Sequence, residues 1–137
     1  MPDSRSDAGT AGSADADTRA RKFRQAAFVY LHVGILYEVI VFVLWRRDLL
    51  PSTRGPGVIW LFFGAAVTLV IFWGLWSWRN VWLARAVWAL HALRLPALVG
   101  GAFFPLPDAV IPPALWAMAI PIVLINLWML ARAGWDL

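Results

Sequence analysis

Hydrophobic residues form four long segments in this chain, and polar residues are concentrated between them. The segments cover residues 25–45, 58–78, 81–104 and 113–133. Each has about 20 residues or more, which at ~1.5 Å per residue lets a helix cross a hydrocarbon core of ~30 Å. The pattern therefore predicts an all-α membrane protein with four transmembrane helices in a small bundle.

The connections between these segments have the composition of turns. Residues 46–57 contain two prolines and two glycines, residues 79–80 form a very short link, and residues 105–113 are rich in proline. Short connections place consecutive helices side by side, so we expect two helical hairpins. Similar short sequences around His32 and His91 suggest a weak internal repeat that relates one hairpin to the other.

The N-terminal stretch differs from the rest of the chain. Residues 1–17 are small, polar and acidic, and they are predicted to be a disordered cytoplasmic tail. The transmembrane domain is then residues 18–137, with Thr18 as the N-cap of the helix that leads into the first span. Pro96 and Pro121 lie inside the third and fourth spans, where they should bend the helices.

Small residues inside the spans predict where helices approach one another closely. They are Gly34 in the first span, residues 64–68 in the second, Gly100 and Gly101 in the third, and Ala114, Ala117 and Ala119 in the fourth.

The positions of the cations predict the orientation. With the N-terminus inside, seven basic residues lie on the inner side (Arg19, Arg21, Lys22, Arg24, Arg79, Arg85 and Arg132) and three on the outer side (Arg46, Arg47 and Arg54). This difference favours two cytoplasmic termini in a bacterial-type inner membrane or an equivalent one. Nine of the ten tryptophans fall near the ends of the spans, where membrane proteins commonly carry them.

The composition argues against a soluble domain, a disulfide-linked protein and a nucleic-acid-binding protein. Hydrophobic residues make up 61% of the chain and charged residues 15%, against roughly 45–50% and about 25% in a soluble domain. The absence of cysteine excludes disulfides and thiolate metal sites. Because the cations that give the net charge of +4 flank the spans, nucleic acid is not an expected partner. No phosphate loop, zinc motif or serine elbow is present, so an enzyme is not expected.

Five polar residues inside the spans are the candidate functional residues. An ionisable group near the bilayer centre costs at least ~2.5–3.5 kcal/mol, so such groups need partners. At ~1.5 Å per residue from the inner end, His32, His91 and Asn126 fall at roughly 10–15 Å. Glu38 and Arg94 fall at roughly 20 Å by the same rise. The matched depth predicts an intramembrane ion pair between Glu38 and Arg94.

The two histidines allow two interpretations. One histidine on each of two helices at similar depth is the arrangement that bis-histidine haem b, or another tetrapyrrole, needs in a helical bundle. Arg94 lies about one turn beyond His91 and could then bind a propionate. In the other interpretation, the histidines hydrogen-bond across the bundle to Asn126, Thr68 or a backbone carbonyl, and no cofactor is bound.

These features favour a non-catalytic accessory or structural subunit of a larger membrane complex, which could be energy-transducing, respiratory or photosynthetic. Its partners would be the lipid bilayer and other membrane-protein subunits. The first alternative is a small haem b electron-transfer protein that uses His32 and His91. The second is a small oligomeric transporter or proton-coupled carrier that works through Glu38 and Arg94.

Overall fold

The computed structural model describes residues 5–47, 57–107 and 111–137, and every regular element in these ranges is helical. The elements are α1 (Arg5–Arg46), α2 (Gly57–Trp73), a π-helical segment η1 (Gly74–Trp78), α3 (Val81–Ala92), α4 (Leu95–Phe103) and α5 (Pro113–Trp135). Four stretches are long and apolar enough to cross a membrane: Ala14–Arg46, Ile59–Trp78, Val81–Phe103 and Pro113–Trp135. The prediction of an all-α, multi-pass membrane protein is confirmed.

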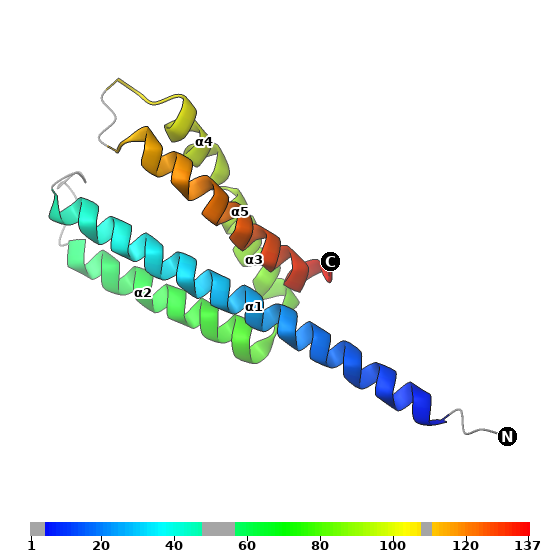
Figure 1. Cartoon of the computed structure of the whole chain (residues 1–137). Coiled ribbons are helices and arrows are strands. Elements are labelled where there is room, and N and C mark those ends of the chain that lie inside the picture. The colour runs from blue at the N-terminus through cyan, green and yellow to red at the C-terminus, as the bar shows by residue number, and fades with distance from the viewer. Residues whose placement is uncertain (1–4, 48–56, 108–110) are drawn as a thin grey trace.

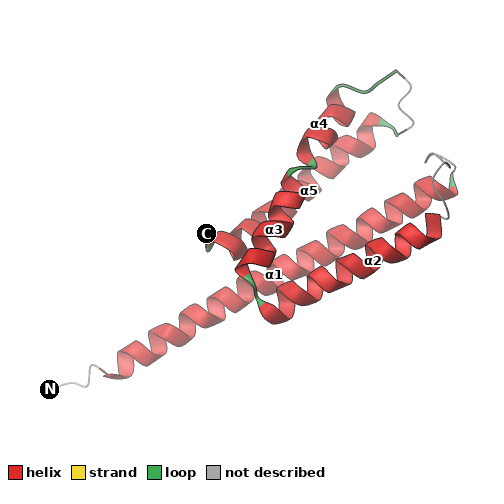
Figure 2. Ribbon diagram, turned by 180° about the vertical axis from the view of Figure 1, so that it is seen from behind, coloured by secondary structure: helices red, strands yellow, loops and turns green. Residues whose placement is uncertain are grey.

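The helices form two hairpins that meet at one end (Figure 1). In the first hairpin α1 packs against α2, and in the second α5 packs against α3 and α4. Contact between α1 and α5 joins the two hairpins. We call the joined end, where Arg24, Arg79 and Arg132 lie, the basic end. The hairpins diverge toward the other end, which we call the open end, and the view from behind shows the same divergence (Figure 2).

Buried residues are concentrated at the basic end. The core cluster takes residues from α1, η1, α3 and α5: Phe23, Ala26, Ala27, Tyr30, Leu75, Ala84, Val87, Leu130 and Ala133. In contrast, α4 buries no residue, and none of residues 59–73 of α2 is buried. Alanine supplies four of the nine cluster positions, so the backbones can approach closely there. The helices therefore form a closed bundle only near the basic end.

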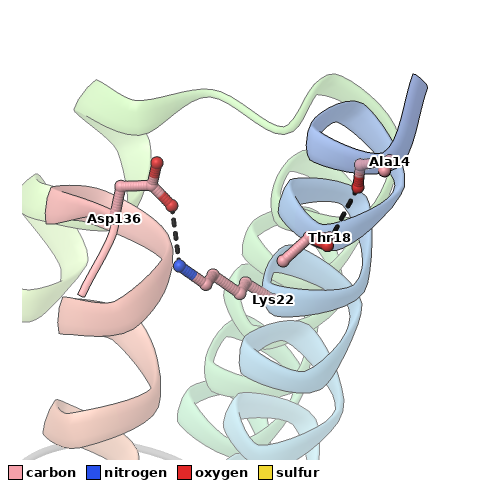
Figure 3. Close-up of polar contacts among 4 residues, drawn as sticks. All are labelled: Ala14, Thr18, Lys22 and Asp136. Carbon is pink, nitrogen blue, oxygen red and sulfur yellow. Dashed lines mark hydrogen bonds and ion pairs between the residues drawn. The ribbon is translucent and has the colours of Figure 1, made fainter. Parts of the chain in front are cut away.

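The first helix is longer than the sequence analysis predicts. Residues 5–17, for which disorder is expected, form the first turns of α1. This stretch is rich in alanine, the best helix former, and it extends a helix that the core already nucleates. The Thr18 hydroxyl donates a hydrogen bond to the carbonyl of Ala14 at 2.9 Å (Figure 3). Thr18 is thus inside the helix and is not its N-cap.

The predicted third span is split by a turn. The amide of Leu93 still donates to the carbonyl of Ala89, four residues back, but that of Arg94 donates to His91, only three residues back. Pro96 has no amide hydrogen and follows at the start of α4, so the helix cannot continue in register. The break places Arg94 at the junction of α3 and α4. Pro121, in contrast, lies within an uninterrupted α5.

Two glycines set the close approach of α1 and α2. A Cβ atom on Gly34 would overlap the side chain of Thr68, and one on Gly64 would overlap the carboxylate of Glu38. At one turn the glycine is on α1 and the larger side chain on α2, and at the next turn the glycine is on α2 and the larger side chain on α1. The predicted close contacts at Gly34 and Gly64 are confirmed. Gly100 has no atom within 4 Å of its Cβ position, so the contact expected there does not form among the described residues.

We expect Gly34→Ala to destabilise the protein by about 1–3 kcal/mol, because the added methyl meets the β-branched Thr68, which has little rotamer freedom. Gly64→Ala should cost less, since the flexible end of Glu38 can move away. Gly100→Ala is the matched control and should be neutral or slightly stabilising. Thermal unfolding followed by circular dichroism in detergent measures all three. Thr68→Ala should remove most of the Gly34→Ala penalty, and failure to do so would contradict the assigned contact.

Candidate functional site

His91 and Tyr30 are two polar side chains that contact each other at the side of the core cluster that faces the open end. His91 of α3 is buried, and its ring meets that of Tyr30 of α1 edge-on, with 5.5 Å between centroids. Asn126 of α5 lies one helical turn before the core residue Leu130 in the sequence, and it is fully buried. Helices α1, α3 and α5 therefore each contribute a buried polar side chain to this half of the molecule.

In both histidines the ring nitrogen Nδ1 is hydrogen-bonded to the backbone carbonyl four residues earlier in the helix. Nδ1 of His91 lies 2.9 Å from the carbonyl oxygen of Val87, and Nδ1 of His32 lies 2.7 Å from that of Phe28. A carbonyl oxygen can only accept, so Nδ1 is the donor in each ring. In a neutral imidazole this leaves Nε2 with a free lone pair, as in many metal-ligating histidines.

The structure does not bring His32 and His91 together. His91 packs on Tyr30, and residues two apart on a helix do not share a face. His32 is exposed and lies on the face of Phe28, which packs against Phe72 and Trp76 of the first hairpin. In this arrangement the two imidazoles cannot ligate one macrocycle from opposite sides. The tetrapyrrole site stays a prediction, without support from the positions of its ligands.

Glu38 and Arg94 also lie apart. Arg94 is exposed, and its guanidinium carbon lies 5.7 Å from the ring centroid of Tyr37, on the first hairpin. Glu38 is the next residue along α1, but its carboxylate lies against Gly64 of α2. Among the described side chains the only ion pair is Lys22–Asp136, so the expected Glu38–Arg94 pair is not formed within this chain. Neighbouring helix residues point about 100° apart, which separates the two charges despite their similar depth.

The two remaining polar candidates, Thr68 and Asn126, differ in the contacts that their side chains make. Thr68 contacts Gly34. Asn126 has no hydrogen-bond partner in the described part of the chain for either its amide nitrogen or its amide oxygen. A buried polar group without a partner costs about 1–3 kcal/mol. The burial of the Asn126 amide is therefore uncompensated among the described residues.

Sequence reasoning missed an arginine that joins two helices at the basic end. Nε of Arg85 in α3 donates to the carbonyl of Gly134 in α5 at 2.9 Å and so satisfies a carbonyl of its last turn. The guanidinium carbon lies 5.3 Å from the ring centroid of Trp82 and 5.2 Å from that of Trp135. Trp88 in turn packs edge-on against Trp135. The sequence analysis assigned these residues to membrane topology, and only the spacing of Trp82, Arg85 and Trp88 at three-residue intervals could have suggested a shared helix face.

A second link at the basic end joins the chain terminus to α1. Nζ of Lys22 donates to a carboxylate oxygen of Asp136 at 2.8 Å (Figure 3). The hydrogen bond from Lys22, followed by the positive charges of Lys22 and Arg19, lowers the pKa of Asp136 below its ordinary value of 3.8. Asp136 ends α5 in the left-handed region, with φ of 57°, a conformation that aspartate and asparagine tolerate.

No protein-family model, no curated protein and no solved structure matches this chain.

We expect Asn126→Leu to keep or raise the stability of the protein, by up to about 1–3 kcal/mol, because it removes the unpartnered amide from an apolar site. The reciprocal change Leu130→Asn, one turn further along α5 at a position that is also fully buried, should lower stability by a similar amount or more. Thermal unfolding in the same detergent compares the two. Strong destabilisation by Asn126→Leu would show that the amide has a partner, such as a bound water or ligand.

Asp136→Asn should lower the melting temperature slightly at pH 6, because it removes the charge that Lys22 and Arg19 stabilise. The folded-state pKa of Asp136 is depressed, so its contribution is present above pH 3.8 and is lost as the pH falls below that value. The difference between the wild type and the variant should thus disappear at the acidic end of a pH series of melting curves. A difference that grows on acidification would contradict this assignment.

Proposed function

We propose that the protein is a non-catalytic subunit of a larger membrane complex, with its basic end in the cytoplasm. The observation that carries the proposal is that charged side chains in the open half of the molecule have no ion-pair partner among the described side chains. Arg94 is exposed and Glu38 is half-buried, yet neither has an ion-pair partner in the part of the chain that the structure describes. Such groups are costly in contact with lipid tails, so another chain is expected to cover them.

Exposed apolar residues alone would not support this proposal. A membrane protein presents apolar side chains to lipid, and lipid tails are as apolar as leucine. Polar side chains on the same surface are different, because lipid tails offer them no hydrogen bonds. Helix α4 and residues 59–73 of α2 also bury nothing within this chain, so both present surface that another chain could cover.

The distribution of cations supports the orientation. Arg24, Arg79, Arg85 and Arg132 lie at the basic end, and the positive-inside rule places such an end in the cytoplasm. The projecting first turns of α1 would then extend beyond the membrane surface (Figure 1). The separation of His32 from His91, and of Glu38 from Arg94, gives a haem or a proton path less support than an accessory role.

The proposal can be tested by photo-crosslinking: a photo-reactive amino acid is placed at one position of the chain, and its adducts in native membranes are identified. Phe103 in the open half is 65% exposed, and Trp82 at the basic end of the same span is 74% exposed, so they form a matched pair. We expect Phe103 to yield a specific adduct with a different polypeptide and Trp82 to yield much less. Adducts with lipid or with no protein at all from Phe103, and from Trp60 on the first hairpin, would contradict the proposed function.

A further inference from the structure

Glu38 lies in an apolar groove on the first hairpin. The groove runs between α1 and α2 and has a volume of about 540 Å³. Its polar lining side chains are Glu38 and Thr68, and its rim includes the exposed residues Ile35, Val39 and Phe62. The Glu38 carboxylate is thus accessible from the side of the hairpin, within a transmembrane span, and it has no cation beside it among the described side chains.

Arg94 has the complementary situation on the second hairpin. It lies at the turn between α3 and α4, is exposed, and contacts the face of the Tyr37 ring. An aromatic ring does not neutralise a guanidinium, and no carboxylate in the described part of the chain does so. Arg94 therefore presents an unneutralised cation at the surface of its span.

The two charges lie at one depth. Glu38 is fourteen residues beyond Arg24 and Arg94 thirteen beyond Val81, so both are about 20 Å from the basic end at ~1.5 Å per residue. The contact between Arg94 and Tyr37, the residue before Glu38, agrees with this count. A chain that neutralises the charge of Glu38 brings a cation to this depth, and a chain that neutralises the charge of Arg94 brings an anion. A second copy of this chain, in the same orientation, brings both.

We propose that two copies of this chain associate side by side in the membrane, with Glu38 of each copy bound to Arg94 of the other. A two-fold axis along the membrane normal keeps both copies at the same depth and makes the contact reciprocal, so one dimer contains two pairs. A carboxylate and a guanidinium can form two parallel hydrogen bonds, and each charge loses its contact with lipid. This inference rests on the proposed role in an assembly, and it identifies one partner within that assembly.

Charge exchange between two differently tagged, co-expressed copies tests the pairing. Glu38→Arg alone or Arg94→Glu alone places like charges at both contacts of a dimer, so recovery of the second tag should fall at least about tenfold. A copy with Glu38→Arg mixed with a copy with Arg94→Glu restores opposite charges at both contacts, and recovery should return to near the wild-type level. Circular dichroism of each variant checks that it is folded.

The same mixture distinguishes a pair between copies from a pair within one chain. A pair within one chain would be restored only when both substitutions are in the same polypeptide, and the mixture of single variants would stay defective. That outcome would overturn the proposal.

Disulfide trapping gives a second readout that leaves both charges in place. The chain has no cysteine, so Val39→Cys in one copy and Leu93→Cys in the other introduce the only thiols, each beside one of the two charges. We expect a disulfide-linked dimer on mild oxidation in membranes. Phe62→Cys paired with Trp82→Cys, at opposite ends of their spans, is the control and should not be trapped. Failure of the first pair to exceed the control would also overturn the proposal.

The two proposals fail in different ways. Loss of trapping between copies, with the adduct from Phe103 to a different polypeptide intact, would refute the dimer and leave the accessory role standing. A trapped dimer without any adduct to a different polypeptide would support self-association and refute a role within a larger, mixed complex.

Discussion

The packing of small residues at the basic end is the contact on which the rest of the structure depends. Ala26 and Ala27 of α1 and Ala84 of α3 let the helices approach closely, and Phe23 and Leu130 fill the space between them. In a bilayer there is little hydrophobic gain from joining apolar helices, so close packing and polar contacts must hold the hairpins together. Loss of this contact would leave two separate hairpins.

Two interruptions of regular helix adapt the chain to this core. The second span ends in the π-helical segment η1, which buries Gly74 and Leu75, although no residue from 59 to 73 of the same span is buried. The third span breaks before Pro96, so α3 stays with the core while α4 follows α5 toward the open end. The segment η1 lies within the closed part of the bundle, and the break before Pro96 falls further from the basic end. This second interruption fixes Arg94 at the junction of α3 and α4.

The sequence was sufficient for the helices and their pairing into hairpins, because length, hydropathy and connection length are local properties. The constant rise of a helix also sets how far along its span each polar residue lies. The sequence did not give the direction in which each side chain points, because that depends on which face of α1 meets each neighbour. Tyr30 and Tyr37 lie seven residues apart on the face that meets the second hairpin, whereas Glu38 is directed toward α2 and His32 away from His91. The Arg85 cluster escaped prediction for the same reason, because Trp135 reaches it from another helix.

The two ends of the molecule differ in how their charged side chains are satisfied. At the basic end Lys22 pairs with Asp136, Arg85 caps α5 between two tryptophans, and Arg24 lies over Trp76. These groups are near the membrane surface, where water could also have satisfied them. In the open half Glu38 and Arg94 lie within their spans and have no ion-pair partner among the described side chains, and a missing partner costs more in hydrocarbon than at a wet surface. This contrast between the two ends is the physical reason for proposing a partner that covers Glu38 and Arg94.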